Sequence, residues 1–298
     1  MNKKIGIVTV LYNSETVLTD FFTSLNNQSC QDFVLYIIDN KSPDNSLELT
    51  RRLVEKSSFS SVVIENEENF GVAKGNNIGI QRALSDGCDM VLLSNNDVTL
   101  EVNAIDSLLD GLISQNASMA VPKIYFYGTD LIWAAGGYFN KMTGLNAHIG
   151  DKEVDTGQFQ RIEKITYAAT CFMLIRKDVF SRVGMMDENY FVYYDDVDFV
   201  YRALKMNETL LYIPESVVHH KESTSTGSMS EFSIRYLYRN LVYFALKNYS
   251  LIYALYVIAL DFGYNFFVLI FKWPFSKWKL RIKSYKEGLL LYKQIYKN

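Results

Sequence analysis

The sequence of 298 residues has few cysteines and no excess of charge of either sign. Its cysteines, Cys30, Cys88 and Cys171, are odd in number and widely spaced, so they offer neither a disulfide framework nor the spacing of a metal site. They are typical of reduced intracellular thiols. The 30 basic and 33 acidic side chains leave a net charge of -3, and no basic stripe indicates a nucleic acid partner. We therefore expect a cytoplasmic protein that binds no nucleic acid.

A secretory signal is also missing. The apolar run over residues 5–12 follows Lys3 and Lys4, but it is short and meets Asn13 without a small-residue cleavage pattern, so we interpret it as a first strand. The hydrophobic content of 49% is sufficient for a substantial core in one large domain or two smaller ones.

Short apolar runs alternate with helical patterns along the first half of the chain. Buried strands are predicted over residues 5–11, 33–38, 62–64 and 90–93, and helices over 15–27, 46–56 and 72–85. This alternation indicates an α/β fold with a mostly parallel sheet. Further along, we expect hairpins or loops over 124–150, a strand over 165–176, a short helix to Val183 and a strand over 210–213.

Polar side chains follow each of the first four predicted strands. Ligands of open parallel sheets bind beyond the carboxyl ends of the strands. Asn and Asp also favour turns for backbone reasons, but together these residues predict a binding site. They are Tyr12 and Asn13, Asp39 and Asn40, Asn69, and Asn95, Asn96 and Asp97.

A glycine-containing segment, NFGVAKGNNIGI, covers residues 69–80. Its glycines are four residues apart, which fits neither a Walker loop nor a dinucleotide motif. We expect Gly75 and Gly79 to let their helix lie close to the sheet. Lys74 and Asn77 are candidates to face a phosphate or a sugar.

The segment FVYYDDVDFVYR, residues 191–202, supplies the candidate catalytic group. On a helix, Asp198 can pair with Arg202 four residues later, which leaves Asp195 and Asp196 at the positive N-terminal end. An ionised carboxylate at that position can accept a proton from a substrate hydroxyl. Acidic residues also occur in first helical turns without any catalytic role.

Two of the protein's three histidines, His219 and His220, are adjacent and follow a predicted strand. Adjacent residues of an extended chain point to opposite sides, so we expect one of them to face the site. Imidazole is a common metal ligand, and Asp97 is a candidate for the complementary carboxylate. A divalent metal that neutralises a departing diphosphate and a base such as Asp196 would together transfer a group from an activated nucleotide.

Five motifs in this order resemble the inverting family 2 glycosyltransferases. They are IGIVTVLYNS, IIDNKSPDNS, NFGVAKGNNIGI, LLSNNDV, and CFMLIRKDVFSRVGMMDENYFVYYDDVDFVYRA with VVHH after it. The resemblance covers roughly residues 4–225 and is greatest to the rhamnosyltransferase-like branch of bacterial polysaccharide synthesis. It implies a GT-A fold, a nucleotide-sugar donor and Mg²⁺ or Mn²⁺ as cofactor.

The resemblance also implies roles for individual residues. Asp196 matches the catalytic base, with Asp195 as a helper, while Asp97 and His220 match the metal ligands. Asn95 stands where the family's DxD motif has its first aspartate, so we expect the donor phosphates to complete a weakened metal site. The donor-binding set is Thr9, Tyr12, Asn13, Asp39, Lys74, Asn77, Asn96 and Asp97, with Asp39 at the nucleotide base.

We divide the chain into a GT-A domain, residues 1–228, and a C-terminal helical region, residues 229–298. An amphipathic helix is predicted over 231–248. The 21-residue apolar run over 251–271 is long enough to cross a bilayer of about 30 Å, but Asp261 and Gly263 lie in its middle. We favour helices that lie at the membrane interface over a spanning helix, and a homodimer interface or a helical cap is the alternative. Headgroup-level candidates are Trp273, Lys277, Trp278, Lys279, Arg281 and Lys283.

The hypothesis at this point is a glycosyltransferase at the inner face of the cell membrane. It would transfer rhamnose from dTDP-rhamnose, or a hexose from a UDP-sugar, to a hydroxyl of a lipid-linked glycan. The loops over 124–150 and the polar run over 223–228 are expected to shape the acceptor side. A nucleotidyltransferase and a non-catalytic nucleotide-binding membrane scaffold are the alternatives.

Overall fold

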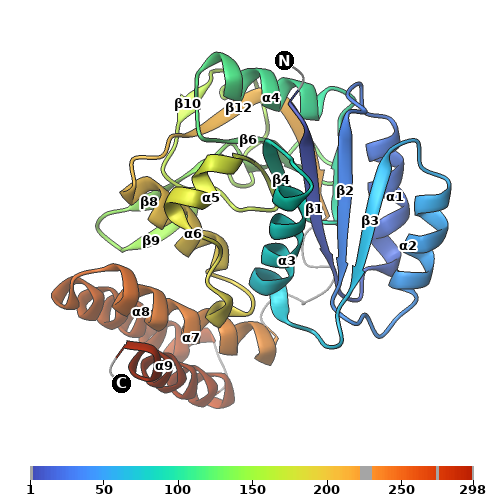
Figure 1. The fold of residues 1–298 in the computed structure, drawn as a ribbon. Helices are drawn as coiled ribbons and strands as arrows, with labels where there is room; N and C mark the ends of the chain where they lie inside the picture. The colour runs from blue at the N-terminus through green and yellow to red at the C-terminus, as the bar shows by residue number, and fades with distance from the viewer. Residues whose placement is uncertain (1–2, 222–229, 273–274, 297–298) are drawn as a thin grey trace.

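A computed structural model describes residues 3–221, 230–272 and 275–296 of the chain. Its centre is a ten-stranded sheet with the strand order β10-β12-β6-β11-β4-β1-β2-β3, in which β5 also pairs with β12 and β7 with β6 (Figure 1). The first four strands are parallel: β1 (Ile5–Leu11), β2 (Phe33–Asp39), β3 (Ser60–Glu65) and β4 (Met90–Ser94). The predicted α/β class and the first four predicted strands are confirmed.

Helices cover both faces of the sheet. One face packs against α1 (Glu15–Asn26), α2 (Ser46–Glu55) and α4 (Ala104–Ser114), and the other against α3 (Gly71–Ser85), α5 (Lys177–Val183) and α6 (Asp195–Lys205). Strand β1 shows how its sequence serves two cores, because Ile5 and Ile7 point to the first face and Val8 to the second.

The second half of the sheet is mixed. Its strands are β5 (Val98–Leu100), β6 (Met119–Phe126), β7 (Ile132–Ala134), β10 (Glu163–Lys164), β11 (Phe172–Arg176) and β12 (Leu210–His220). Strand β11 is antiparallel to both β4 and β6, while β6 and β12 are parallel. The expected hairpin in the loop region is formed by β8 (Gly137–Asn140) and β9 (Leu145–His148).

Two predictions for this half need correction. The strand expected over 165–176 begins only at Phe172, because Tyr167 instead bridges to Gly137 and so directs the preceding segment toward the hairpin. The strand expected to end at Ile213 continues past Pro214 to His220, through an irregularity in its pairing with β6.

Gly79 and Gly75 bring α3 close to the sheet, as predicted. A Cβ atom at Gly79 would lie 2.4 Å from Val8 Cγ1, and one at Gly75 would lie 2.8 Å from Val10 Cγ1. Any larger residue would push this helix, and the site at its N-terminus, away from the strands.

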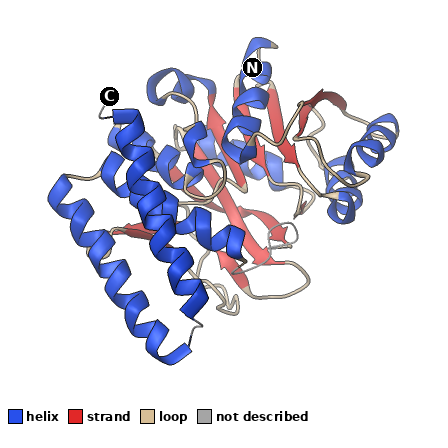
Figure 2. Ribbon diagram, turned by 90° about the horizontal axis from the view of Figure 1, so that it is seen from below, coloured by secondary structure: helices blue, strands red, loops and turns tan. Residues whose placement is uncertain are grey.

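Three C-terminal helices form a separate layer beside the α/β part (Figures 1 and 2). They are α7 (Glu231–Asn248), α8 (Leu251–Lys272) and α9 (Phe275–Tyr296). In the described ranges, we find no helix with the length and apolarity that a membrane crossing requires. The boundary at residues 228 and 229 stays a prediction, and the polar run over 223–228 and Trp273 lie outside the described residues.

Candidate active site

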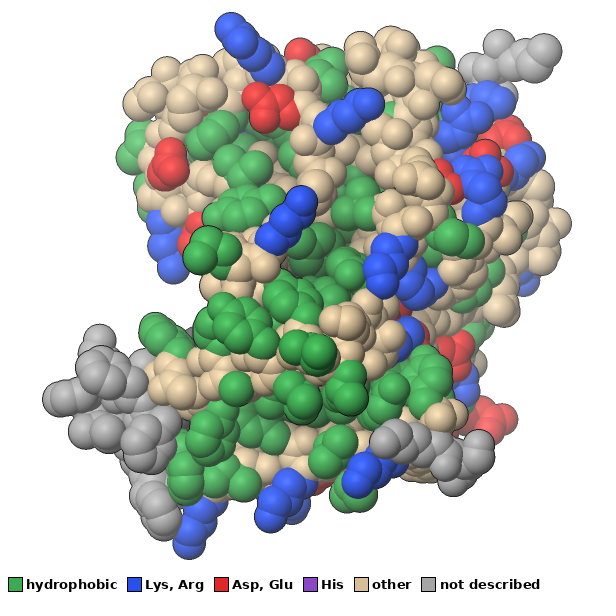
Figure 3. Space-filling model, turned by 90° about the vertical axis from the view of Figure 1, so that its left-hand side faces the viewer, with side chains coloured by type: hydrophobic (Ala, Val, Ile, Leu, Met, Phe, Trp, Pro, Cys, Tyr) green, Lys and Arg blue, Asp and Glu red, His purple; other side chains and the backbone are tan. Residues whose placement is uncertain are grey.

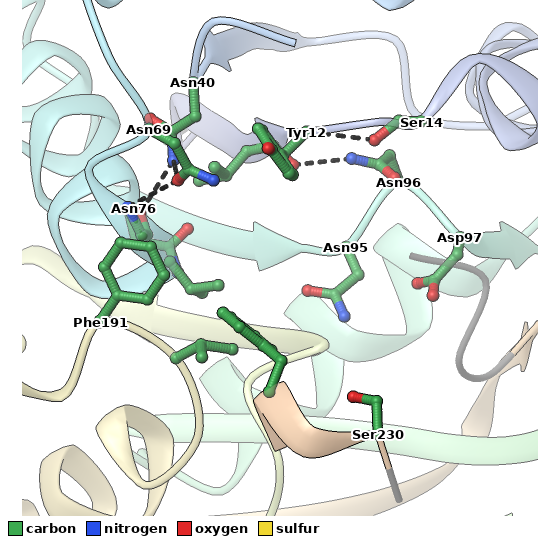
Figure 4. A pocket seen from close by; sticks show the side chains of 15 residues that line it. Tyr12, Ser14, Asn40, Asn69, Asn76, Asn95, Asn96, Asp97, Phe191 and Ser230 are labelled. Atoms are coloured by element: carbon green, nitrogen blue, oxygen red, sulfur yellow. Dashed lines mark hydrogen bonds between the residues drawn. The ribbon is translucent and has the colours of Figure 1, made fainter. Parts of the chain in front are cut away.

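A cavity of about 670 Å³ opens at the carboxyl ends of β1, β2 and β4 (Figure 4). The N-terminus of α3, the loop before α6 and the start of α7 form its other walls. It is lined by Val10, Tyr12, Ser14, Asn40, Asn69, Gly71, Val72, Asn76, Asn95, Asn96, Asp97, Phe191, Val192, Ser230 and Phe232. The cavity therefore lies at the strand ends, where the polar residues predicted a binding site.

Of the eight residues expected to bind a donor, Tyr12, Asn96 and Asp97 line this cavity. Asn96 is fixed there because its Nδ2 donates a hydrogen bond to the Val10 carbonyl at 2.7 Å. The other five, Thr9, Asn13, Asp39, Lys74 and Asn77, are not among the lining residues.

The contacts of three of these five residues explain their placement. Thr9 is fully buried within β1, and Asp39 accepts hydrogen bonds from the Ser42 N–H. Asn77 is buried and bonds to the backbone of Met186 and to Glu188, so its amide is used inside the protein. We therefore treat Asn77 as a structural residue and not as a sugar contact.

Asn40 organises the floor of the cavity. Its Nδ2 donates to the Gly71 carbonyl at 2.9 Å, and its Oδ1 accepts from Asn66 Nδ2 at 2.8 Å. Asn69 Oδ1 in turn accepts from the Gly71 N–H at 2.9 Å. The network connects the end of β2 to the N-terminus of α3, where an anion would be stabilised by the helix dipole.

Asp97 and His220 form the candidate metal centre. Asp97 Oδ1 lies 3.2 Å from His220 Nε2, and both side chains are largely buried. Neither atom, nor His220 Nδ1, has a hydrogen-bond partner among the residues that the structure describes. Buried polar atoms are normally paired, so these orphaned groups fit a cation. Within the same residues, no cluster of three or more His, Cys, Asp or Glu side chains accompanies them.

Asp195 and Asp196 open α6, as predicted. Asp196 Oδ2 accepts a hydrogen bond from Tyr167 Oη at 3.2 Å, and its Oδ1 accepts one from the Val197 N–H at 2.8 Å. Burial raises the pKa of Asp196, and these two hydrogen bonds lower it in part. Burial and the charge of Asp196 also raise the pKa of the more deeply buried Asp195.

Buried side chains link the two centres. Burial and then the charges of Asp97 and Asp196 raise the pKa of the Cys171 thiol, so both carboxylates lie near this one buried group. A row of rings also connects them: Trp133 lies 4.8 Å from His220 and 4.4 Å from His148, centroid to centroid, and His148 lies 5.6 Å from Tyr167. This aromatic wall thus leads from the candidate metal centre to the candidate base.

The loop before α6 has an unusual backbone. Phe191, Tyr193 and Tyr194 have φ values of 67°, 62° and 67°. Such left-handed conformations cost non-glycine residues on the order of 1–3 kcal/mol each and persist only when their surroundings impose them. The loop is therefore held in place by contacts from outside its own sequence.

Asp198 pairs with Arg202, as predicted. It is fully buried, and its Oδ2 accepts a hydrogen bond from Arg202 Nε at 2.7 Å. Its Oδ1 lies 2.8 Å from Lys247 Nζ and also accepts from Asn248 and Tyr190. A buried carboxylate with these partners ties α6 to α7 and is not available as a base.

Comparison with known proteins identifies the class. Residues 6–184, more than half of the chain, match the family described as Glycosyl transferase family 2, and the chain belongs to this family. The solved structure of GalNAc-T7 with UDP, GalNAc and Mn²⁺ has a similar fold, with a TM-score of 0.64 at 17% identity. The match covers 80% of this chain and 47% of that one, so the chain spans about half the length of that protein. The fold is that of the GT-A glycosyltransferases.

Two relatives by sequence are rhamnosyltransferases. The dTDP-rhamnosyl transferase RfbF of Shigella flexneri is 27% identical over 227 residues, which cover 74% of this chain and 70% of that protein. The N-acetylglucosaminyl-diphospho-decaprenol L-rhamnosyltransferase of Mycobacterium tuberculosis is 25% identical over 150 residues, which cover 47% and 49%. The rhamnosyl specificity remains a property of these relatives.

Several residues of the site had no assigned role in the sequence analysis. Trp133 and His148 come from the segment expected to form hairpins or loops, and Tyr167 from the segment expected to form a strand, and no pattern singles them out. Ser230 and Phe232 belong to the C-terminal region, in which the sequence analysis named no site residue. The one available signal is that Trp133 and His148 are side chains capable of binding a sugar in a segment without a regular sequence pattern.

Proposed function

We propose that the protein is an inverting glycosyltransferase that transfers rhamnose or a hexose from a nucleotide diphosphate donor to a hydroxyl of a lipid-linked glycan. The observation that carries the proposal is the aromatic wall between the Asp97–His220 pair, whose facing atoms have no hydrogen-bond partner, and Asp196. Transfer from a nucleotide sugar with inversion needs a diphosphate site and a base on opposite sides of the sugar, because the hydroxyl attacks opposite the leaving group.

In this proposal the nucleotide occupies the cavity, with its diphosphate toward Asp97. Asp97 and His220 would hold Mg²⁺ or Mn²⁺, which neutralises the leaving diphosphate when bound. Asp196 accepts the proton of the acceptor hydroxyl as that oxygen bonds to the anomeric carbon. The bond to the diphosphate breaks on the opposite face, so the configuration inverts. Asp195 would stay protonated beside the base and contact the acceptor.

The raised pKa of Asp196 suits this role. A carboxylate whose pKa lies above its usual range is a stronger base, and it remains ionised as long as the pH exceeds that pKa. Tyr167 and the Val197 N–H orient its oxygens.

A screen of donor hydrolysis and transfer tests the proposal. dTDP-rhamnose and UDP-hexoses would be offered with Mg²⁺ or Mn²⁺ to wild-type protein and to the Asp196→Asn variant. We expect a loss of about 10²–10⁴-fold, the usual contribution of a general base. Asp130→Asn, an exposed position lining a second cavity, is the matched control. Transfer by Asp196→Asn near the wild-type rate would contradict the assignment.

We also propose that α8 meets the cytoplasmic face of the membrane, where a lipid-linked acceptor is located. Apolar side chains gather on the helical layer in Figure 3. On α8 the large exposed ones are Leu251, Ile252, Leu255 and Tyr256, with exposed fractions of 65%, 84%, 56% and 47%. Tyr253 Oη of α8 donates a hydrogen bond to the Lys141 carbonyl in the turn between β8 and β9. This bond brings the exposed Met142 next to α8.

Sedimentation with vesicles that contain anionic lipid tests this contact. Leu255→Glu should lower the bound fraction by about tenfold, since the variant loses an apolar side chain that the membrane would bury and adds a charge. Ile113→Glu changes an exposed apolar residue of α4 and is the control. Equal binding of both variants and wild type would refute the assigned surface.

A further inference from the structure

Two neighbouring residues of α7, Arg239 and Asn240, are bonded to the loop that carries the candidate base. Asn240 is fully buried, and its Nδ2 lies within hydrogen-bond distance of the carbonyls of Tyr190, Val192 and Tyr193 at 3.0, 2.8 and 2.8 Å. Arg239 Nη2 donates to the carbonyls of Asn189 and Tyr190 at 2.8 and 2.6 Å. Arg239 Nε in turn donates to Asn240 Oδ1 at 2.7 Å.

These contacts are to backbone oxygens, so they fix the path of the chain and not one side chain. The same loop contains the left-handed residues Phe191, Tyr193 and Tyr194. A segment in that conformation relaxes when its outside contacts are removed. Asp195 and Asp196 follow the last of these residues directly, so relaxation would move both carboxylates.

The opposite side of the loop rests on the N-terminus of α3. The Phe191 carbonyl accepts a hydrogen bond from the Val72 N–H at 2.6 Å, and a Cβ atom at Gly71 would lie 2.3 Å from the same oxygen. The loop is therefore held between α3, which lines the cavity, and α7.

Helix α7 also reaches the cavity itself. Ser230 and Phe232 at its start line the wall, and the Phe191 ring stacks on Tyr236 with centroids 5.2 Å apart. Figure 4 shows Phe191 and Ser230 at the cavity, on the side opposite the strand ends. One helix thus contacts both the cavity and the loop that ends at the base.

We propose that Arg239 and Asn240 are positioning residues for catalysis, which set the distance between the nucleotide cavity and Asp196 by holding residues 189–193. The proposal rests on the proposed function, because it names what α7 contributes to that reaction. The C-terminal region is then part of the catalytic unit, whatever contact it makes with a membrane.

The Asn240→Asp variant tests the proposal in the full chain. Aspartate keeps the volume and the acceptor for Arg239 but loses the donors to the loop. Misplacement of a catalytic group by roughly 1 Å costs about 100-fold in rate, so we expect kcat to fall by that factor. The KM for the donor and the Kd for UDP or dTDP, measured by calorimetry, should change less than about twofold, since uniform binding is retained.

Arg239→Lys is the second variant, since it keeps the charge but lacks the planar guanidinium group that reaches two carbonyls. Arg235→Ala, one helical turn earlier, is the matched control, with kcat unchanged. It removes a partly exposed ion pair with Glu287 and a guanidinium 6.0 Å from the Tyr236 ring centroid, but no hydrogen bond to the loop carbonyls. A wild-type kcat in both test variants would overturn the proposal. So would a parallel loss of nucleotide affinity, because the two residues would then shape the cavity and not the base.

Hydrogen exchange separates this proposal from the proposed function. Backbone amides of residues 189–196 should exchange at least about tenfold faster in Asn240→Asp than in wild type, while amides of β1 stay protected. If the loop amides exchange faster in Asn240→Asp but the wild-type protein transfers no sugar, the proposed function is refuted and the role of Asn240 in positioning the loop is retained. Unchanged exchange in the loop would overturn the positioning role in an active enzyme.

Discussion

The Tyr167→Phe substitution removes one hydroxyl group from the side of the proposed base. Tyr167 Oη donates to Asp196 Oδ2 at 3.2 Å, and the ring packs against Phe139 and His148. The phenylalanine ring keeps these packing contacts. A hydrogen bond to the ionised carboxylate favours the charged form. Burial already raises the pKa of Asp196, and the loss of this hydrogen bond would raise it further.

The size of this shift follows from the geometry. A hydrogen bond to a charged group contributes about 1.5–3 kcal/mol, and 3.2 Å is long for a hydroxyl donor, so we use the lower limit. One pKa unit corresponds to about 1.4 kcal/mol, and the expected increase is therefore about one unit. Protonated Asp196 is inactive as a base, so activity rises as the pH passes through its pKa. The acidic limb of the plot of transfer rate against pH should move to higher pH by the same amount.

The pH dependence of kcat/KM for sugar transfer measures this shift. On the acidic side Tyr167→Phe should be about tenfold slower than wild type, and the two rates should converge on the plateau where Asp196 is ionised in both. Tyr125→Phe is the control, because its hydroxyl donates to Asp155 beside the second cavity. An unchanged acidic limb, or one that moves to lower pH, would refute Asp196 as the base whose ionisation controls the rate.

Two further predictions concern the metal centre and the loop. His220→Ala should raise the Mn²⁺ concentration needed for half-maximal transfer by at least about tenfold, since even indirect partners of a metal ligand contribute that much. A metal titration with and without UDP measures this effect. An unchanged Mn²⁺ concentration for half-maximal transfer would count against His220 as a ligand. Gly71→Ala should lower the stability by roughly 1–3 kcal/mol, because its φ of +80° disfavours a side chain and the new Cβ would contact the Phe191 carbonyl. Thermal unfolding and kcat measure this effect, and a variant with wild-type values of both would show that the loop adapts.

Local pattern was sufficient to predict strands β1 to β4 and helices α1 to α3. Strand β1 occupies the predicted residues because a short run rich in β-branched residues suits burial on both faces. Helix α4 was not predicted, although Ile105, Leu108 and Leu112 have helical spacing. Strand β6 was also missed, and its sequence contains Pro122 and the buried Lys123, which are rare in central strands. Lys123 is stable there only because it pairs with Asp155, a contact that the strand's own sequence does not reveal.

The site residues also fall into two groups, those that local sequence predicts and those that depend on contacts between residues far apart in the chain. Asn96, Asp97 and Asp196 follow strands or open helices, so chain order alone brings them to one edge of the sheet. Asn240 bonds to carbonyls that lie 47 to 50 residues earlier, and nothing in an amphipathic helix indicates that contact. The candidate residues for the chemistry could therefore be named from local pattern and the family resemblance, whereas those that hold them in position required the tertiary structure. A variant series limited to the predicted acidic residues would leave the contribution of α7 untested.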